Sequence, residues 1–277
     1  MKIVDLSSRA AVVEEMDRPD SPQELLYRTL TQFQLVNRIF TRYRRVLARS
    51  VLQDMAEDGS RSYRLADLGA GGCDIARWLV RRCRERGLRL AISAVEHDPR
   101  VARYARAANA GYSEIQVVEA DALNGELWEG ADYIFANHLL HHLSNEKCIE
   151  LIRQIDRSGP RQYLLSDVVR SRWAYHGFRL AAAPFFRNSF VVHDGPASIR
   201  RSFTLPEVRT LIRAAAPVHP VAICRHLPSR FVIRGGTKAG LHPVEQVRQV
   251  GHRGHSSIPR WRKPGRMVKK LHAASRW

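Results

Sequence analysis

The feature that most constrains this chain is a glycine-rich turn between an apolar run and a helical pattern. The apolar run contains Leu65 and Leu68 and is typical of a buried strand, and the turn contains Gly69 and Gly71. A helical pattern continues through Trp78. Glycine permits backbone conformations closed to other residues and leaves room for close approach by a ligand. A strand, a glycine turn and a helix in this order therefore predict a ligand site at a helix N-terminus.

Two kinds of nucleotide-like ligand compete for such a turn. The dinucleotide fingerprint G-x-G-x-x-G needs a glycine at position 74, where this chain has Asp74, and Asp67 stands just before the turn. Carboxylates so placed would repel a pyrophosphate but attract S-adenosylmethionine, which carries an ammonium and a sulfonium and no phosphate. The pattern Asp67-x-Gly69-x-Gly71 resembles the first motif of class I S-adenosylmethionine-dependent methyltransferases, with Cys73 in place of the usual third glycine. The alternatives are a dehydrogenase and an ordinary turn of another α/β protein.

Acidic residues also end the next two expected strands. Glu96 follows the run 90–95, where a carboxylate can accept both ribose hydroxyls. The resemblance implies that Asp121 accepts from the adenine amine and that the Ala122 N–H donates to the adenine ring. Ligands of open α/β sheets bind at the carboxyl ends of the strands, so we expect one S-adenosylmethionine site there. The predicted cofactor-binding residues are Asp67, Gly69, Gly71, Asp74, Glu96, His97, Asp121, Ala122 and Asn137.

The order of apolar runs and helical patterns predicts an α/β fold. Strands and helices alternate up to about residue 169, which predicts a parallel sheet with right-handed crossovers, and the last two runs predict an antiparallel hairpin. The resemblance implies a Rossmann-like, mostly parallel seven-stranded sheet with helices on both faces. The expected strands are the run at 65–68 and residues 90–95, 115–118, 132–136, 163–169, 218–226 and 229–234.

Shifts in composition divide the chain into segments. Apolar residues at three- and four-residue steps predict helices that begin at a capping box of Ser21 and Glu24, and a second box at Thr204 and Glu207 predicts a later helix start. The tail lacks an apolar period and is expected to be disordered. The predicted segments are a flexible N-terminus (1–20), an N-terminal helical cap (21–58), a methyltransferase domain (59–238) with a lid insertion (170–203), and a basic tail (239–277).

The insertion 170–203 is rich in aromatic residues and follows the fifth expected strand. We interpret it, together with the N-terminal helices, as a lid over the site, with core packing as the alternative for any single ring. After its first residue, Arg170, it carries five arginines and one acid, which suits an acceptor of anionic or phenolic character or an acidic partner. These charged residues are Arg172, Arg179, Arg187, Arg200, Arg201 and Asp194.

Methyl transfer requires both reactants to be held in line, water to be excluded and, for some acceptors, a proton to be removed. The end of the fourth strand offers His138, His141 and His142, and histidine is the usual general base near neutral pH. We predict His141 and His142 as catalytic candidates, with a structural role as the alternative. His193 beside Asp194 is a second candidate pair. No further ligand has clear metal spacing, so no metal is predicted.

The charge of the chain is uneven. Residues 241–277 contribute +8 of the formal net charge of +18, so the tail is the place where a nucleic-acid contact, the alternative to a small-molecule partner alone, would be made. No run of 18 apolar residues and no secretory signal occurs, and the four cysteines have no metal spacing. These observations predict a cytoplasmic protein with reduced thiols and no membrane span, and they leave the oligomeric state open.

The predicted function is methylation of a small molecule. The segment 194–203 and the long N-terminal helices resemble a bacterial subgroup of secondary-metabolite methyltransferases, which implies O-methylation of a phenolic or polyketide-like acceptor. C- or N-methylation of a small molecule, an RNA methyltransferase that uses the basic tail, and a non-catalytic binding protein are the alternatives. The Asn/Asp-Pro-Pro-Tyr/Phe signature of nucleobase and glutamine modifiers does not occur.

Overall fold

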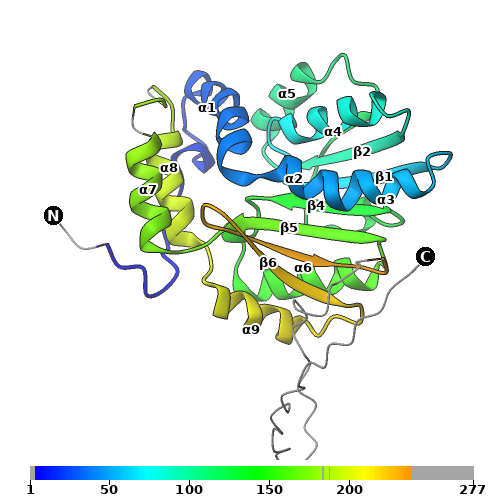
Figure 1. Ribbon diagram of the computed structural model, residues 1–277. Coiled ribbons are helices and arrows are strands. Elements are labelled where there is room, and N and C mark those ends of the chain that lie inside the picture. The colour runs from blue at the N-terminus through cyan, green and yellow to red at the C-terminus, as the bar shows by residue number, and fades with distance from the viewer. Residues whose placement is uncertain (1–3, 183, 187, 239–277) are drawn as a thin grey trace, which may run out of the picture. The chain divides into compact units, whose positions relative to one another are not determined.

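The computed structural model describes residues 4–182, 184–186 and 188–238, which contain one seven-stranded sheet of order β3-β2-β1-β4-β5-β7-β6 (Figure 1). Neighbouring strands from β3 to β5 pair in parallel, and β7 pairs antiparallel with both β5 and β6. The predicted α/β sheet with a terminal hairpin is therefore confirmed. The strands are β1 (Ser62–Leu68), β2 (Arg89–Glu96), β3 (Ile115–Glu119), β4 (Tyr133–Asn137), β5 (Gln162–Val168), β6 (Val221–His226) and β7 (Arg230–Gly235).

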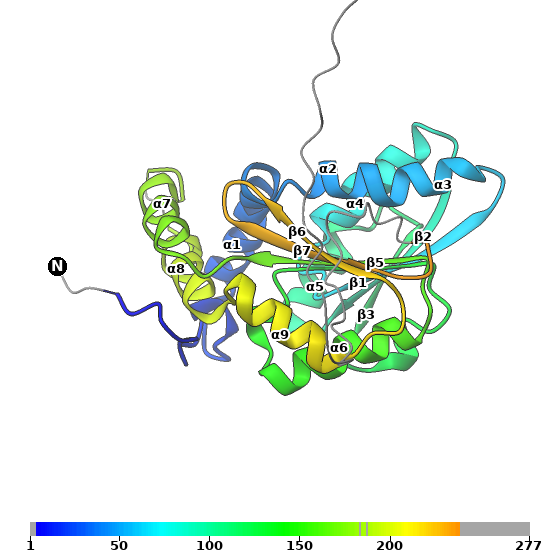
Figure 2. The ribbon, with the colours of Figure 1, turned by 60° about the horizontal axis from the view of Figure 1, so that its bottom comes forward.

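Helices cover both faces of the sheet. Figure 2 shows α2, α3 and α4 on one side and α6 and α9 on the other. The apolar residues of the central strands are buried against both layers, which is why these strands are nearly continuously apolar. The helices are α1 (Gln23–Val36), α2 (Tyr43–Leu47), α3 (Gln53–Glu57), α4 (Asp74–Arg84), α5 (Pro99–Ala108), α6 (Asn145–Arg157), α7 (Arg172–Ala182), α8 (Val191–Arg201) and α9 (Leu205–Ala215).

The two predicted capping boxes have different outcomes. The box at α9 is confirmed, because the Glu207 carboxylate accepts from the Thr204 N–H at 2.7 Å and the Thr204 side chain caps the helix in return. The box at α1 is wrong, since the N-cap of that helix is Pro22 and no side chain bonds there. The Ser21 hydroxyl instead accepts from Arg100 Nη1 at 2.8 Å, so a tertiary contact replaces the local one.

The N-terminal helices form a broken series rather than one or two regular helices. Short π-helical segments, Asn37–Thr41 and Ala48–Leu52, separate α1, α2 and α3. Arg42 has a left-handed φ of 52°, which ends the first π-helical segment and turns the chain toward the sheet. The break gives the series two partners, because α1 packs beside α5 and α8 while α2 and α3 belong to the core on the sheet.

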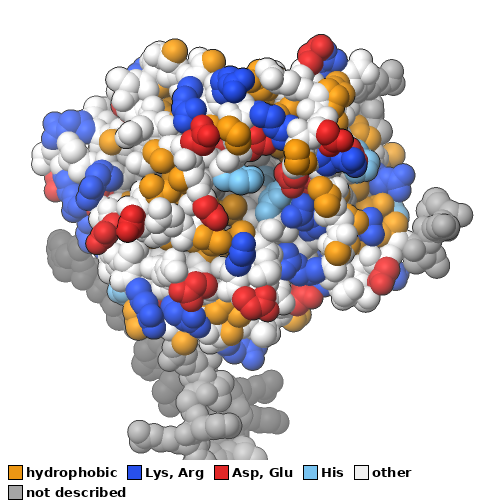
Figure 3. All heavy atoms as spheres, turned by 180° about the vertical axis from the view of Figure 1, so that it is seen from behind, with side chains coloured by type: hydrophobic (Ala, Val, Ile, Leu, Met, Phe, Trp, Pro, Cys, Tyr) orange, Lys and Arg blue, Asp and Glu red, His pale blue; other side chains and the backbone are white. Residues whose placement is uncertain are grey.

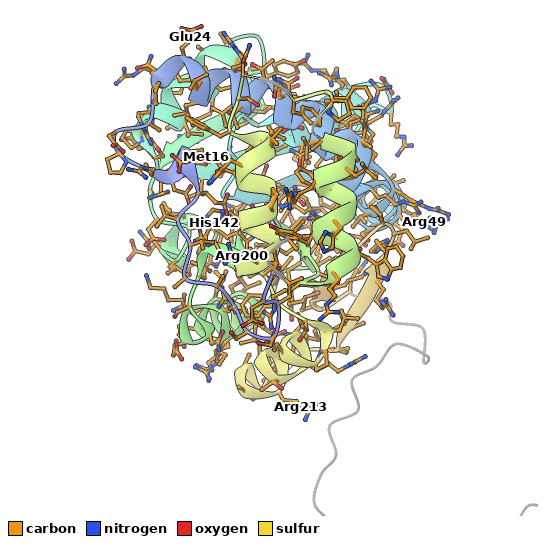
Figure 4. The ribbon with its side chains drawn as sticks, turned by 90° about the vertical axis from the view of Figure 1, so that its left-hand side faces the viewer. Met16, Glu24, Arg49, His142, Arg200 and Arg213 are labelled. Carbon is orange, nitrogen blue, oxygen red and sulfur yellow. The ribbon has the colours of Figure 1, made fainter. Side chains whose placement is uncertain are left out.

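Three helices lie beyond the carboxyl ends of the parallel strands. In Figure 1, α1, α7 and α8 stand at that end of the sheet, and Figure 4 shows α7 and α8 side by side. The N-terminal segment, expected to be loose, is packed against this layer. The buried Asp194 carboxylate of α8 accepts from the backbone N–H groups of Glu15 and Met16 at 2.8 and 3.0 Å. Residues 4–17 therefore belong to the cap in this structure.

The remaining sequence expectations concern the thiols, membrane spans and the tail. All four cysteines are free thiols. Among the described residues, no helix is both long and apolar enough to cross a membrane. The predicted basic tail, residues 239–277, lies outside the described part of the chain.

Candidate cofactor and acceptor site

The glycine-rich turn brings backbone groups to the end of β1. The N–H groups of Gly69 and Ala70 both donate to the Val95 carbonyl, at 2.9 and 3.0 Å, which fixes the turn on β2. Gly71 has a φ of 53° and Cys73 a φ of 56°, so both occupy the left-handed region. The left-handed backbone at Cys73 is a physical reason for glycine to be usual at that position.

Glu96, at the end of β2, is held in place by the turn. One carboxylate oxygen accepts from the Gly71 N–H and the other from the Asp98 N–H, each at 3.0 Å. The Asp98 carboxylate in turn caps α5. Because both oxygens are fixed by backbone donors, the remaining lone pairs of Glu96 have a defined direction toward the space beside the turn.

Two further carboxylates crowd the same turn. Asp67 is 4% exposed, and burial, with the charges of Asp74 and Glu96, raises its pKa to about 8. Burial also raises the pKa of Asp74 to about 6, against a hydrogen bond that its carboxylate accepts from Asn37 at 3.1 Å. This clustered negative charge suits a positively charged ligand, which would relieve the repulsion.

All nine residues predicted to bind the cofactor line a single cavity of about 940 Å³. Asp121 and Ala122 reach it from the end of β3, Asn137 from the end of β4, and the largely exposed His97 from the end of β2. The volume lies near the upper end of the usual range for ligand sites, about 300–1,000 Å³. The topology thus gathers these side chains in one place, with room beside them for a second ligand.

The rest of the cavity extends beneath the helical layer. Its walls include Phe40, which follows α1, and Phe178 of α7, whose ring centroids lie 5.7 Å apart. Trp173 of α7 also lines the cavity, whereas Phe186 and Phe203 are buried in apolar clusters outside it. The lid insertion therefore contributes some aromatic residues to the cavity wall and others to the buried apolar clusters.

The arginines of the insertion 170–203 were expected to suit an anionic acceptor, but most of them do not line the cavity. Arg201 alone of the described insertion arginines lines the cavity, and Arg187 lies outside the described residues. The arginine that the sequence analysis missed is Arg230, at the start of β7. It lies opposite Val168 of β5, because β7 runs antiparallel and begins where the parallel strands end.

His141 is buried between two carboxylates. Its Nδ1 lies 2.9 Å from an oxygen of Asp167, at the end of β5, and its Nε2 lies 3.4 Å from Glu14. Burial alone would lower the pKa of His141, but the charge and hydrogen bond of Asp167, together with Glu14, raise it to about 9. A histidine that is already protonated at neutral pH suits a structural charge pair better than proton abstraction.

His138 presents a neutral ring to the cavity. It has a left-handed φ of 63°, and its Nε2 lies 3.0 Å from Nη1 of Arg230, which is a donor. Burial and the Arg230 charge hold the pKa of His138 well below 6.5. Its Nε2 lone pair is occupied by that contact, so His138 is not available as a base in this arrangement.

His142 lines the cavity beside the N-terminal segment. Its Nδ1 lies 3.1 Å from a carboxylate oxygen of Asp17, and its side chain is partly exposed. In Figure 4, Met16 and His142 lie on the same side of α8. A carboxylate on Nδ1 fixes the ring, and Nε2 lies 4.0 Å from a carboxylate oxygen of Glu14.

The other candidates are structural by their contacts. The Asp194 carboxylate binds the His193 ring and the N-terminal backbone, and neither residue lines the cavity. Two groups of atoms have metal-ligand spacing, Glu14 with His141 and His142, and His138 with His141 and Asp167. In both groups the acidic charge already faces a protonated histidine or arginine.

Residues 65–158 match a family model described as a methyltransferase domain. Among solved structures, a putative O-methyltransferase from Nostoc punctiforme superposes with a TM-score of 0.53 and 14% identity, over 83% of this chain and 65% of that one. The CurJ carbon methyltransferase superposes with a TM-score of 0.56 and 11% identity, over 76% of this chain and 59% of that one. At these identities the likeness is one of fold.

The chain spans about two thirds or less of the length of these solved structures. No curated protein matches the sequence.

Proposed function

We propose that this chain, whose residues 65–158 match a methyltransferase-domain model, is a class I S-adenosylmethionine-dependent methyltransferase that methylates an oxygen of a small phenolic or polyketide-like molecule. S-adenosylmethionine supplies an activated methyl group on a positively charged sulfur. The three carboxylates of Asp67, Asp74 and Glu96 are suited to hold that cation. In this proposal Asp121 and the Ala122 N–H contact the adenine, and Glu96 binds the ribose.

The observation that carries the proposal is the single cavity with two chemically different parts. One part lies at the strand ends and is acidic, and the other lies under α1, α7 and α8, where apolar and aromatic side chains are joined by the charged side chains of Glu14, Asp17 and Arg201. An acceptor in the second part would be covered by helices and held against the first. That arrangement supplies positioning and exclusion of water, which are the main requirements of methyl transfer.

His142 is the residue we propose as general base. Asp17 orients its ring through Nδ1, so Nε2 can take the proton of an acceptor hydroxyl while the oxygen receives the methyl group. His141 positions the loop as a buried cation between Glu14 and Asp167. The two catalytic candidates of the sequence analysis thus receive different roles.

Two alternatives have some support. The likeness to a carbon methyltransferase keeps C-methylation open, because the same fold serves both reactions. An RNA methyltransferase is favoured by the basic tail. Against it, the molecular face in Figure 3 shows Lys and Arg interspersed with Asp and Glu rather than gathered in one stripe.

Calorimetry with S-adenosylhomocysteine tests the cofactor assignment. We expect binding to the wild type, none of a nicotinamide dinucleotide, and at least about tenfold weaker cofactor binding to Glu96→Gln, which loses charge-assisted hydrogen bonds. The matched control is Glu119→Gln, because Glu119 pairs in register with Glu96 on β3 but contacts Arg106 and does not line the cavity. Dinucleotide binding in place of the cofactor would contradict the assignment.

Product analysis tests the reaction. The wild type is incubated with methyl-labelled S-adenosylmethionine and a panel of phenols, and separately with RNA, and the labelled atom is identified by NMR. Label on oxygen, lost in His142→Ala with cofactor affinity retained, is the expected result. Label on carbon would favour the first alternative, and label only on RNA the second.

A further inference from the structure

Two arginines line the cavity, and they differ in how their charge is balanced. The guanidinium of Arg201 lies 3.5 Å from Glu14 and 3.2 Å from Asp17, so it faces two carboxylates. Arg230 is 4% exposed and forms no ion pair with any described residue. Its charge is therefore buried inside the cavity wall without a direct partner of opposite sign.

The hydrogen bonds of Arg230 go to neutral groups. Its Nη2 donates to the Asn137 amide oxygen at 2.7 Å and to the Ser166 hydroxyl at 3.0 Å, and Nη1 lies 3.0 Å from His138 Nε2. The Arg230 Nε–H has no partner among the described residues. Of the five N–H hydrogens of the guanidinium, the one on Nε and one of the two on Nη1 therefore have no hydrogen-bond acceptor among the described residues.

The carboxylate whose charge acts on Arg230, that of Asp167, already has a partner. Asp167 accepts from the buried cationic ring of His141 at 2.9 Å. Burial lowers the pKa of Arg230 to about 10, opposed by the charge of Asp167, so the guanidinium stays charged at neutral pH. A buried charge without a hydrogen-bonded ion-pair partner is costly to the fold, and such groups are typical of sites where a ligand supplies a counter-charge.

The surroundings of Arg230 indicate what carries that counter-charge. The same cavity has Phe40 and Phe178 as walls, with rings tilted by 57°, and Val36 and Ile199 as aliphatic neighbours. Flat apolar walls suit an aromatic ring, and a guanidinium with two N–H donors that lack an acceptor suits an ionised oxygen. The acidic part of the cavity would repel the same anion.

We propose that Arg230 binds an ionised oxygen, a carboxylate or a phenolate, on an aromatic methyl acceptor. This inference rests on the proposed function, because the ligand it describes is the acceptor of that reaction. The anion forms the ion pair that Arg230 lacks among the described residues, and the aromatic side chains of the cavity contact the ring of the acceptor. Arg230 is on this view a specificity-determining residue for anionic acceptors.

The test measures paired probes by calorimetry on the full chain loaded with S-adenosylhomocysteine. Each pair is an aryl carboxylate and its neutral amide: benzoate with benzamide, 2-naphthoate with 2-naphthamide, and salicylate with salicylamide. We expect the wild type to bind at least one anion about tenfold or more tighter than its amide. Arg230→Gln should lose that preference and keep the affinity for the amide.

Two further variants make the result specific. Arg230→Lys keeps the charge but not the planar fork, so it should retain the anion preference with at least about threefold weaker binding. Arg234→Gln is the matched control, since Arg234 lies on the same strand, bonds to Gln162 and does not line the cavity, and it should behave as the wild type. If the Gln variant does not fold, the Lys variant decides.

The proposal is overturned if no anion is preferred by the wild type, if the preference survives in Arg230→Gln, or if Arg230→Lys binds as tightly as the wild type. The affinity for S-adenosylhomocysteine is measured first in each protein. A wild type that fails to bind it contradicts the proposed function, whereas a wild type that binds it without any anion preference contradicts only the role of Arg230.

Discussion

Binding of S-adenosylmethionine should release a proton from Asp67. In the free protein, burial and the charges of Asp74 and Glu96 raise the pKa of Asp67 to about 8, so this carboxyl is mostly protonated at pH 7. A cation placed beside it favours the ionised form and lowers that pKa. The proton that Asp67 held then leaves to the buffer.

The size of the effect follows from the pKa. With a value of about 8, roughly nine tenths of Asp67 is protonated at pH 7, so about 0.9 proton is released per cofactor bound. Affinity should rise about tenfold per pH unit as pH increases toward 8 and then level off. Below pH 6 the slope should steepen, because burial raises the pKa of Asp74 to about 6 and both acids then carry protons.

The same pKa has a consequence for stability. An acid whose pKa is raised on folding is ionised in the unfolded chain above about pH 4 but stays protonated in the folded protein up to about pH 8. The Asp67 contribution to the free energy of unfolding therefore falls as pH rises through that window, by on the order of 1.4 kcal/mol per unit. Asp67→Asn should remove this slope in the free protein.

Calorimetry in buffers of different ionisation enthalpy measures the proton release directly. The observed binding enthalpy at pH 7 should change with buffer in proportion to about 0.9 proton in the wild type and in the Glu119→Gln control, and not in Asp67→Asn. An enthalpy independent of buffer in the wild type, or an equal dependence in Asp67→Asn, would refute the idea that this carboxylate faces the cofactor's charge.

Three other substitutions separate binding, structure and shape. Glu96→Gln should weaken cofactor binding by about 10- to 100-fold in calorimetry, since it removes one carboxylate charge and sets an amide NH2 against a backbone N–H donor of Gly71 or Asp98. His141→Ala should destabilise the fold by about 3–5 kcal/mol at pH 6, because it leaves the Asp167 carboxylate buried without its cation. The pKa of His141 is raised to about 9, so denaturant titration should show a smaller loss of stability above pH 9. An equal loss at both pH values would contradict the ion pair. Gly195→Ala places a Cβ 2.0 Å from the Phe178 ring, so it should lower the free energy of unfolding by about 1–3 kcal/mol. It should also weaken binding of the acceptor but not of the cofactor. Unchanged acceptor affinity would show that Phe178 does not form part of the acceptor site.

The fold was predictable because its signals are local and repeated. The central parallel strands β4 and β5 are short apolar runs buried almost throughout, so the apolar run alone marks them. The carboxyl ends of parallel strands meet at one edge, which is why a residue as distant in sequence as Asp121 could be assigned to the same site as Asp67. Chain order sufficed here without any knowledge of packing.

The parts that failed depend on contacts between distant segments. Ser21 has the sequence of a cap, but the guanidinium of Arg100 takes its hydroxyl instead. The N-terminal segment has no period of its own, and the buried carboxylate of Asp194 holds its backbone. His141 and His142 are neighbours in sequence with different surroundings, because Asp167 of β5 contacts His141 whereas Asp17 of the N-terminal segment contacts His142. No local pattern contains that information.

The position of Arg230 follows from strand direction and gives the cavity its polarity. A parallel strand delivers the residues at its carboxyl end to the site, whereas the antiparallel β7 delivers its first residue, so the hairpin brings a cation to the edge where β1 and β2 bring acids. A cationic cofactor is attracted to the acids and repelled by Arg230, and an anionic acceptor experiences the reverse. On the proposed function, the two reactants would be sorted into their own parts of one cavity by charge, with the methyl group transferred across the boundary between them.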